Sequence, residues 1–209
     1  MIDPIIQRNV HTLNHKKLIE DCVAAHLPKR QIARQLYFLS PSFAFDGNLD
    51  LQLNLYEKIC DFLQLPLSAI RVVGSGHTGF SLVKNTAFDK TKSDLDIAIV
   101  DSQLYLNLFE LAFETTNGWK DVSKFSGSVH KQKTTKDDFL RYLRKGVIRP
   151  DLMPSSPHKA EWDNFFGKLG DEYSSFCNGI SAGVYAKELF MAAKQESALD
   201  AYISNQGNL

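Results

Sequence analysis

The chain has 209 residues, of which 44% are hydrophobic and 23% are charged, a composition typical of a globular protein with a buried core. Lysine plus arginine equals aspartate plus glutamate at 24 each, so the net charge does not indicate nucleic-acid binding. A polyanion would have to bind to a local patch of basic residues. The first residues lack the basic start and apolar stretch of a signal peptide, and no run reaches membrane-spanning length. We therefore expect a cytoplasmic protein that is not itself bound to a membrane. Cys22, Cys60 and Cys177 form no CxxC pair, which predicts reduced thiols that pack in the core.

The first third of the chain is predicted to be mostly helical. Apolar residues recur at helical spacing over residues 14–39 and 49–63, and a turn-rich segment separates the two. After Pro66 we expect a strand at 70–73, a Gly-Ser turn, a helical turn at 80–83, a polar loop at 85–93 and a strand at 95–100. The remaining expected elements are helices at 102–115, 135–145, 162–169 and 186–201, an extended segment at 147–153, and a strand at 180–185.

This order of elements predicts an α+β fold in a single domain. Residues 1–65 form its helical N-terminal part, and residues 66–185 form a core in which helices pack on a small mixed sheet. A C-terminal helix and a mobile tail complete it at 186–209, because the polar, glycine-containing end has little to pack against.

Asp94 and Asp96 stand two residues apart at the start of the strand expected at 95–100. Alternate side chains of a strand share one face, so the two carboxylates point the same way while Leu95 and Ile97 point into the core. Adjacent carboxylates repel each other, and a divalent cation relieves that repulsion. An oxygen-rich pair without Cys or His nearby is typical of a Mg²⁺ or Mn²⁺ site, so the pattern indicates phosphate chemistry.

A glycine-serine turn, Gly74-Ser75-Gly76, follows the strand expected at 70–73. Such a turn leaves backbone amides free at the start of a helix, where they bind anions. Together with the paired aspartates, it resembles the signature of the DNA polymerase β type nucleotidyltransferase superfamily: a hydrophobic residue, Gly, Ser, a spacer, then Asp-hydrophobic-Asp-hydrophobic. The resemblance implies a polymerase β-like fold. The spacer at 76–93 is longer than is usual in the superfamily, which indicates an inserted loop.

Phosphoryl transfer with two metal ions needs a further carboxylate. In the superfamily this residue lies on a neighbouring strand, often followed by two hydrophobic residues and Pro, and the sequence Asp-Leu-Met-Pro that begins at Asp151 matches the pattern. Pro150 fits poorly in a central strand because it has no N–H, so Asp121 stays open as the alternative.

The resemblance implies a role for each of these residues. Asp94 and Asp96 would bind both ions, and Asp151 would complete the site of the ion beneath the acceptor oxygen. The turn at 74–76 would hold the β and γ phosphates.

Several other residues near this site have two interpretations. Lys92 and Arg149 would attract triphosphate or nascent DNA, or they are ordinary solvated charges. His77 would touch a phosphate, or it is a surface residue. Asp101 is predicted to cap the helix that follows it. The aromatic residues at 162–166 have helical spacing, which favours core packing over a platform for stacked bases.

The size of the chain, its GSGHTGFSL turn, its IRPDLMP segment and its AGVY strand are similar to bacterial defence nucleotidyltransferases, in particular those of the two-gene Hailong anti-phage system. That resemblance implies template-independent synthesis of short single-stranded DNA oligomers, mainly deoxyadenylate made from dATP, primed on a tyrosine hydroxyl near the C-terminus. Tyr202 is the only tyrosine after Tyr185, and its other interpretation is packing beside Leu199 and Ile203. The resemblance also implies a partner, a membrane channel that the oligomer holds closed.

Two other functions stay open at this point. The first is a toxin-antitoxin type nucleotidyltransferase that adds NMP to a separate tRNA or protein, and the second is an inactive scaffold that keeps the fold for interactions. The sequence does not choose the base, because selectivity needs a pocket assembled from distant positions.

Overall fold

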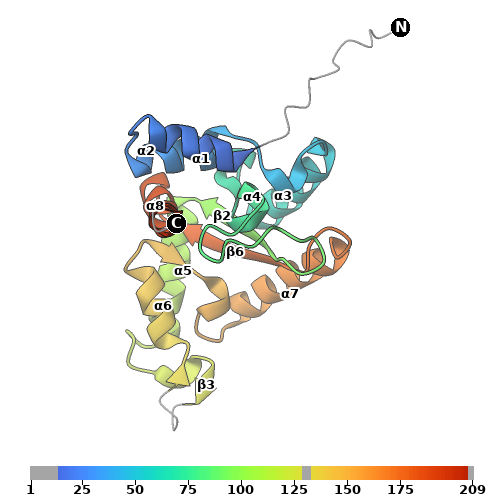
Figure 1. Ribbon diagram of the computed structural model, residues 1–209. Coiled ribbons are helices and arrows are strands. Elements are labelled where there is room, and N and C mark those ends of the chain that lie inside the picture. Colours follow the sequence, from blue (N-terminus) through green and yellow to red (C-terminus); the bar gives the residue numbers. More distant parts are fainter. Residues whose placement is uncertain (1–13, 129–132, 207–209) are drawn as a thin grey trace, which may run out of the picture.

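The computed structural model describes residues 14–128 and 133–206, which form an α+β fold around a small mixed sheet. The sheet has the strand order β1-β2-β6-β5. Strand β1 (Ile70–Val73) runs antiparallel to β2 (Leu95–Val100), which is parallel to β6 (Ile180–Tyr185), and β5 (Val147–Ile148) runs antiparallel to β6. Strands β2 and β6 cross the middle of the molecule, with α1 (His15–Ala24) and α2 (Lys29–Arg34) on one side and α7 (Pro157–Glu172) on the other (Figure 1).

One face of the sheet is closed by helices. Leu95, Ile97 and Ile99 of β2 are buried there. Their cover comes from α3 (Leu49–Leu63), α5 (Ser102–Thr115) and α7, whose apolar residues belong to the same core cluster. Helix α6 (Lys136–Leu143) adds Phe139 to this cluster. The larger hydrophobic core therefore lies on this face.

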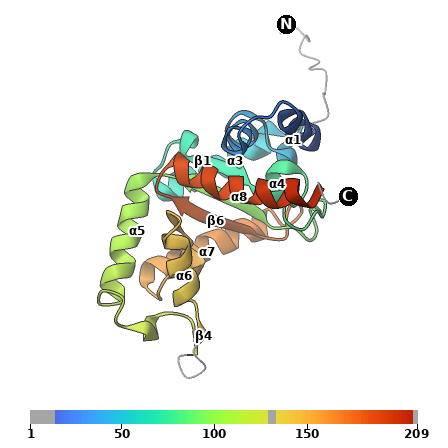
Figure 2. The same cartoon turned by 60° about the vertical axis from the view of Figure 1, so that its left-hand side comes forward.

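The opposite face is covered by the two ends of the chain. Helices α1 and α2, a π-helical segment at Gln35–Leu39 and α8 (Glu188–Gln206) form a second core with Ala98 of β2. Ion pairs join α2 to α8, between Arg30 and Glu196 at 3.0 Å, between Arg34 and Glu188 at 2.9 Å, and between Lys29 and Asp200. Helix α8 crosses in front of β6 in Figure 2.

Most expected elements are confirmed, and several match to the residue. The strands at 70–73, 95–100 and 180–185 and the helices at 49–63 and 102–115 have the predicted bounds. Asp101 is the predicted N-cap, since its carboxylate accepts a hydrogen bond of 2.7 Å from the Leu104 N–H. The three cysteines are buried and free, as predicted.

Three predictions about local structure need correction in detail. The helical residues expected at 14–39 form three pieces, α1, α2 and the π-helical segment, and Pro28 is the N-cap of α2. The helical turn expected at 80–83 is a single turn at 81–85, closed by the Asn85 N–H, which donates to the Ser81 carbonyl at 2.8 Å. A short helix, α4 (Gly74–Thr78), begins directly at the glycine turn and ends at Gly79, which has a φ of 84°. The segment at 147–153 is extended only over β5 and then forms a 3₁₀ turn at Pro150–Leu152.

The smaller elements complete the chain. They are 3₁₀ turns at Phe43–Phe45, Leu67–Ala69 and Val122–Lys124, and a hairpin of β3 (Gly127–Ser128) and β4 (Lys133–Thr134), which the sequence did not predict. Within residues 14–128 and 133–206, no helix is long and apolar enough to cross a membrane. The mobile tail was predicted to follow Tyr202, but residues 203–206 continue α8, and residues 207–209 lie outside the described residues.

Candidate functional site

Asp94 and Asp96 lie at the N-terminal end of β2, and both are exposed. Leu95 between them is fully buried in the larger core. The alternation along the strand is therefore as predicted, with carboxylates on one face and apolar side chains on the other.

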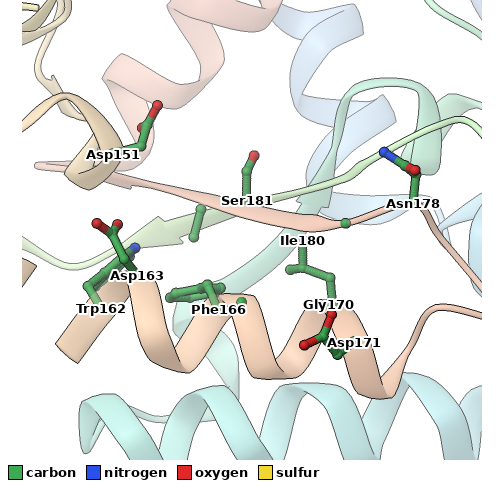
Figure 3. A pocket seen from close by; sticks show the side chains of 12 residues that line it. Asp151, Trp162, Asp163, Phe166, Gly170, Asp171, Asn178, Ile180 and Ser181 are labelled. Atoms are coloured by element: carbon green, nitrogen blue, oxygen red, sulfur yellow. The ribbon is translucent and has the colours of Figure 1, made fainter. Parts of the chain in front are cut away.

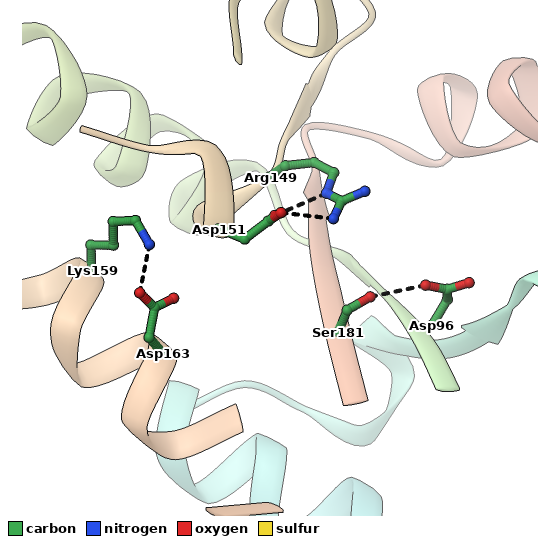
Figure 4. Close-up of polar contacts among 6 residues, drawn as sticks. All are labelled: Asp96, Arg149, Asp151, Lys159, Asp163 and Ser181. Carbon is green, nitrogen blue, oxygen red and sulfur yellow. Dashed lines mark hydrogen bonds and ion pairs between the residues drawn. The ribbon is translucent and has the colours of Figure 1, made fainter. Parts of the chain in front are cut away.

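Each of the two aspartates accepts one hydrogen bond from the β6 side of the sheet. Ser181 pairs with Asp96 across the parallel strands and donates its hydroxyl proton to Asp96 Oδ1 at 2.9 Å (Figure 4). Asn178 donates from Nδ2 to Asp94 Oδ1 at 3.0 Å. Among the described residues, the second oxygen of each carboxylate receives no hydrogen bond. These bonds orient the two groups and leave one oxygen of each free to bind a cation.

The glycine turn lies directly against Asp96. Gly74 has a φ of 64°, and a Cβ atom at this position would lie 2.7 Å from Asp96 Oδ2. A Cβ at Gly76 would lie 2.7 Å from Leu95 Cδ1. A larger residue at either position would force the Asp96 or the Leu95 side chain to move, and at Gly74 the positive φ also favours glycine. The predicted phosphate-binding turn, with Ser75 at its centre, is thus adjacent to the predicted metal ligands.

Asp96 lines a cavity of about 240 Å³ that also contains two cationic side chains. These are Arg149, which follows β5, and Lys194, on the inner side of α8. Burial lowers the pKa of Lys194, while Asp96 acts in the opposite direction. The cavity lining consists of Val73, Gly74, Asp96, Ile97, Arg149, Ser181, Ala182, Gly183, Tyr185, Lys194 and Gln195.

Sequence reasoning missed Lys194, Ser181 and Asn178. A signal for Lys194 was available, since it lies three residues after Met191 and directly before Gln195, at the edge of the helix stripe that carries the buried residues of α8. A lysine on such a stripe either extends past the core or faces a polar cavity. No comparable signal marked the other two, because each depends on strand register.

Asp151 does not join the other two aspartates. It lies in the 3₁₀ turn after β5, and β6 separates β5 from β2. Arg149 holds its carboxylate in a bidentate pair, donating from Nε at 2.9 Å and from an Nη at 2.8 Å (Figure 4). Pro150 accounts for the turn, because it cannot supply the N–H that a longer β5 would need.

The fallback residue, Asp121, is engaged elsewhere. Its carboxylate accepts hydrogen bonds from the backbone and hydroxyl of Ser123, which lower the Asp121 pKa, and it caps a 3₁₀ turn. Within the described residues, no three Asp, Glu, His or Cys side chains are placed to hold one ion. Asp94 and Asp96 each have a carboxylate oxygen without a hydrogen bond among the described residues, and both the first and the second metal ion stay predictions.

Lys92 lies on the surface of the loop before β2. Its side chain is 81% exposed, and its ammonium lies 3.5 Å from a carboxylate oxygen of Asp89. The loop is fixed by that aspartate, which accepts hydrogen bonds from the backbone and hydroxyl of Thr91. A role for Lys92 in binding triphosphate stays a prediction.

Both interpretations of His77 were wrong. The side chain is only 3% exposed, and its Nε2–H donates to the Leu36 carbonyl at 2.5 Å. The rings of His15 and Tyr37 pack at centroid distances of 5.1 and 4.9 Å. Burial and the neighbouring His15 lower the pKa of His77 to about 4. His77 therefore joins the N-terminal helices to the turn.

Tyr202 is enclosed in the second core. It is 3% exposed, its ring lies 5.3 Å from that of Phe80, and its hydroxyl has no hydrogen-bond partner among the described residues. Burial and Glu20 raise its pKa. The residue continues α8 instead of lying in a free tail, so its hydroxyl can meet a substrate only if the end of α8 unwinds.

A second cavity, of about 370 Å³, lies on the other side of β6 between the strand and α7 (Figure 3). It shares Ser181 and Ala182 with the Asp96 cavity and includes Asn178, the partner of Asp94. Trp162 and Phe166 are buried, as predicted for core residues, and still form part of its wall. Asp151 faces this second cavity.

Comparison with known proteins found no match to any family model, curated protein or solved structure. The assignment of the site therefore depends on its geometry.

Proposed function

We propose that this protein is a metal-dependent nucleotidyltransferase with a polymerase β-like core. One observation carries the proposal: Asp94 and Asp96 lie side by side, each with a free oxygen, where Gly74 brings the glycine turn against Asp96 Oδ2. Paired carboxylates suit Mg²⁺ or Mn²⁺. The cationic side chains in the cavity that Asp96 lines suit the triphosphate that such an ion accompanies.

Each side chain of the site would have a separate role in the reaction. Asp94 and Asp96 would hold the cation, which when bound neutralises charge on the triphosphate and lowers the pKa of an attacking hydroxyl. Arg149 and Lys194, which both line the cavity, would hold the phosphates together with the turn of Ser75. The hydroxyl oxygen would attack the α-phosphorus and lose its proton, and pyrophosphate would leave.

Asp151 would complete the site of a second ion after a local change. Its carboxylate is now neutralised by Arg149. A triphosphate offers that guanidinium a competing bidentate partner. Binding of the nucleotide would thus release Asp151 for metal coordination.

For the acceptor, we propose Tyr202, with dNTPs as donors and dATP favoured, giving single-stranded DNA oligomers that act on a membrane channel in anti-phage defence. The structure supplies one supporting observation, the unpartnered hydroxyl of Tyr202. A buried polar group without a partner costs about 1–3 kcal/mol, which lowers the cost of releasing this turn of α8.

A separate acceptor is the second candidate. The enclosure of Tyr202 favours it, because a tRNA or protein hydroxyl could reach Asp94 and Asp96 without any unwinding of α8. The two candidates share the metal and nucleotide sites and differ in the acceptor and in the nucleotide that is transferred.

Intact mass spectrometry after incubation with Mg²⁺ and each nucleotide, both dNTPs and NTPs, separates the candidates. A ladder of nucleotide additions on the protein that is lost in Tyr202→Phe supports self-priming. Label on an added tRNA or protein, with an unmodified enzyme, supports the second candidate. Asp94→Ala/Asp96→Ala should abolish both. Full activity of this double variant would refute the site.

A further inference from the structure

We infer that the cavity between β6 and α7 is a nucleoside subsite, which holds the base and sugar of the donor nucleotide whose phosphates occupy the Asp96 cavity. The inference rests on the proposed function and adds to it a binding site for the uncharged part of the substrate, the nucleoside. The two cavities adjoin, because Ser181 and Ala182 of β6 line both of them.

The charges around the second cavity exclude phosphate. Its charged lining side chains are all carboxylates, from Asp151, Asp163 and Asp171. Without a nucleotide, Arg149 neutralises the first and Lys159 the second, at 2.8 and 2.5 Å, while within the described residues no ion pair involves Asp171. A cavity with unpaired negative charge repels an anion and accepts groups that donate N–H or O–H. Nucleoside hydroxyls and base amino groups are such donors.

The lining of this cavity includes two aromatic side chains, which favours an aromatic ligand. Trp162 and Phe166 form part of its wall, with ring centroids 4.8 Å apart. A volume of about 370 Å³ is within the range of small-ligand pockets, which starts at about 300 Å³. Stacking of a base on an aromatic side chain contributes about 1–3 kcal/mol.

The edge of β6 adds hydrogen-bonding groups. Strand β5 pairs only with Val184 and Tyr185, so residues 180–183 have no strand neighbour on that side within the described residues. An unpaired strand edge presents backbone N–H and C=O groups in alternation. A nucleobase edge also carries donors and acceptors in one plane, so it complements this part of the strand.

Gly167 offers a direct way to test the assignment. It lies on α7 in the cavity wall, and a Cβ placed on it meets no atom within 4 Å. Gly167→Leu should therefore fill the cavity without strain, and it improves the helix propensity of the site. Asn164→Leu is the matched control, since Asn164 is exposed on the same helix and lines neither cavity.

The experiment is calorimetric titration of the full chain, without metal, using deoxyadenosine and inorganic tripolyphosphate as separate probes. Wild type should bind both. Gly167→Leu should weaken deoxyadenosine binding at least 10-fold and leave tripolyphosphate binding within 2-fold of wild type. Lys194→Ala should do the reverse, and Asn164→Leu should change neither.

Three results would overturn the inference: no deoxyadenosine binding by wild type, undiminished binding by Gly167→Leu, or an equal loss in Asn164→Leu. If Gly167→Leu does not fold, amide NMR of the wild type decides, because deoxyadenosine must shift the Ile180 and Ser181 resonances. The titration needs neither metal nor turnover. Failure of the catalytic assignment, seen as unchanged transfer in the Asp94/Asp96 double variant, is therefore a separate outcome.

Discussion

The two faces of β2 differ in how completely they are covered. Leu95, Ile97 and Ile99 face a continuous layer of helices, whereas Asp96 and Ala98 face the two ends of the chain, which cover Ala98 and leave Asp96 exposed. The two faces of this strand therefore contribute differently. The face buried under helices stabilises the fold, and the incompletely covered face leaves Asp96 accessible to a ligand.

The largest expected loss of activity comes from substitutions on the incompletely covered face of β2. Asp94→Ala/Asp96→Ala should lower nucleotide transfer by at least about 1,000-fold, since removing one group that stabilises developing charge commonly costs about 100- to 1,000-fold. Folding should be nearly unaffected, because two adjacent exposed carboxylates repel each other. Transfer rates and thermal melts of the purified variant check both statements. Asp96→Asn, which can still accept the bond from Ser181, should be equally inactive.

The closed face should show the opposite pattern. Ile99→Ala, on the same strand but outside the lining of the Asp96 cavity, should lower the free energy of unfolding by about 2–5 kcal/mol, because it leaves a cavity in the larger core. Its transfer rate at a temperature where it is folded should stay close to wild type. Urea denaturation gives the free energy, and a loss below about 1 kcal/mol would show that this face is not tightly packed.

Lowering the pH should destabilise the second core, because His77 becomes protonated. Its folded-state pKa of about 4 lies below the usual 6.5, so the neutral form stabilises the fold above pH 6.5 and this stability is lost as the pH falls towards 4. Each unit of difference between the two pKa values corresponds to about 1.4 kcal/mol, so the total loss of unfolding free energy is about 3 kcal/mol. Unfolding free energies measured from pH 7 to pH 4 should show the loss.

The groups that face His77 are His15, Tyr37, Ser40 and the Leu36 carbonyl. Burial also lowers the pKa of His15, so this second histidine adds to the acid sensitivity in the same direction. His77→Gln keeps an N–H donor and should flatten the pH dependence. His158→Gln, at an exposed site, should leave it unchanged. Identical slopes in the two variants would contradict the assignment.

The smallest effect concerns two tyrosines with different hydrogen bonding. Tyr202→Phe removes an unpartnered hydroxyl and should raise the free energy of unfolding by about 1 kcal/mol. Tyr56→Phe should lower it by a similar amount, because the Tyr56 hydroxyl accepts bonds of 3.1 Å from Gln52 and from the Val72 N–H. Denaturant titrations compare them, and a loss of stability in Tyr202→Phe would show that its hydroxyl has a partner.

The sequence predicted the parts of the fold that depend on local patterns. The alternation around Asp94 and Asp96, the glycine turn against them and the cap at Asp101 all follow from spacing and residue type. Contacts between distant segments were not predictable in this way. Ser181 meets Asp96 only because β6 pairs with β2 in one register, and the chain separates them by 85 positions.

Asp151 and Tyr202 show a second limit of sequence patterns. The motif around Asp151 matched, yet Pro150 ends the strand early and Arg149 takes the carboxylate. The polar end of the chain indicated a free tail, yet the apolar stripe of α8 extends to Tyr202 and buries it. The position of Asp151 depends on a neighbouring side chain, and the burial of Tyr202 depends on a helix face. A short sequence motif shows neither.

The central claim is that Asp94 and Asp96 hold a divalent cation beside a triphosphate. Anomalous diffraction from crystals grown with Mn²⁺ and a nonhydrolysable dATP analogue tests it most directly. We predict a manganese peak at about 2.0–2.2 Å from an oxygen of each aspartate, with the triphosphate lying along the glycine turn. Manganese bound at another place, or a nucleotide bound with no metal at these carboxylates, would contradict the account.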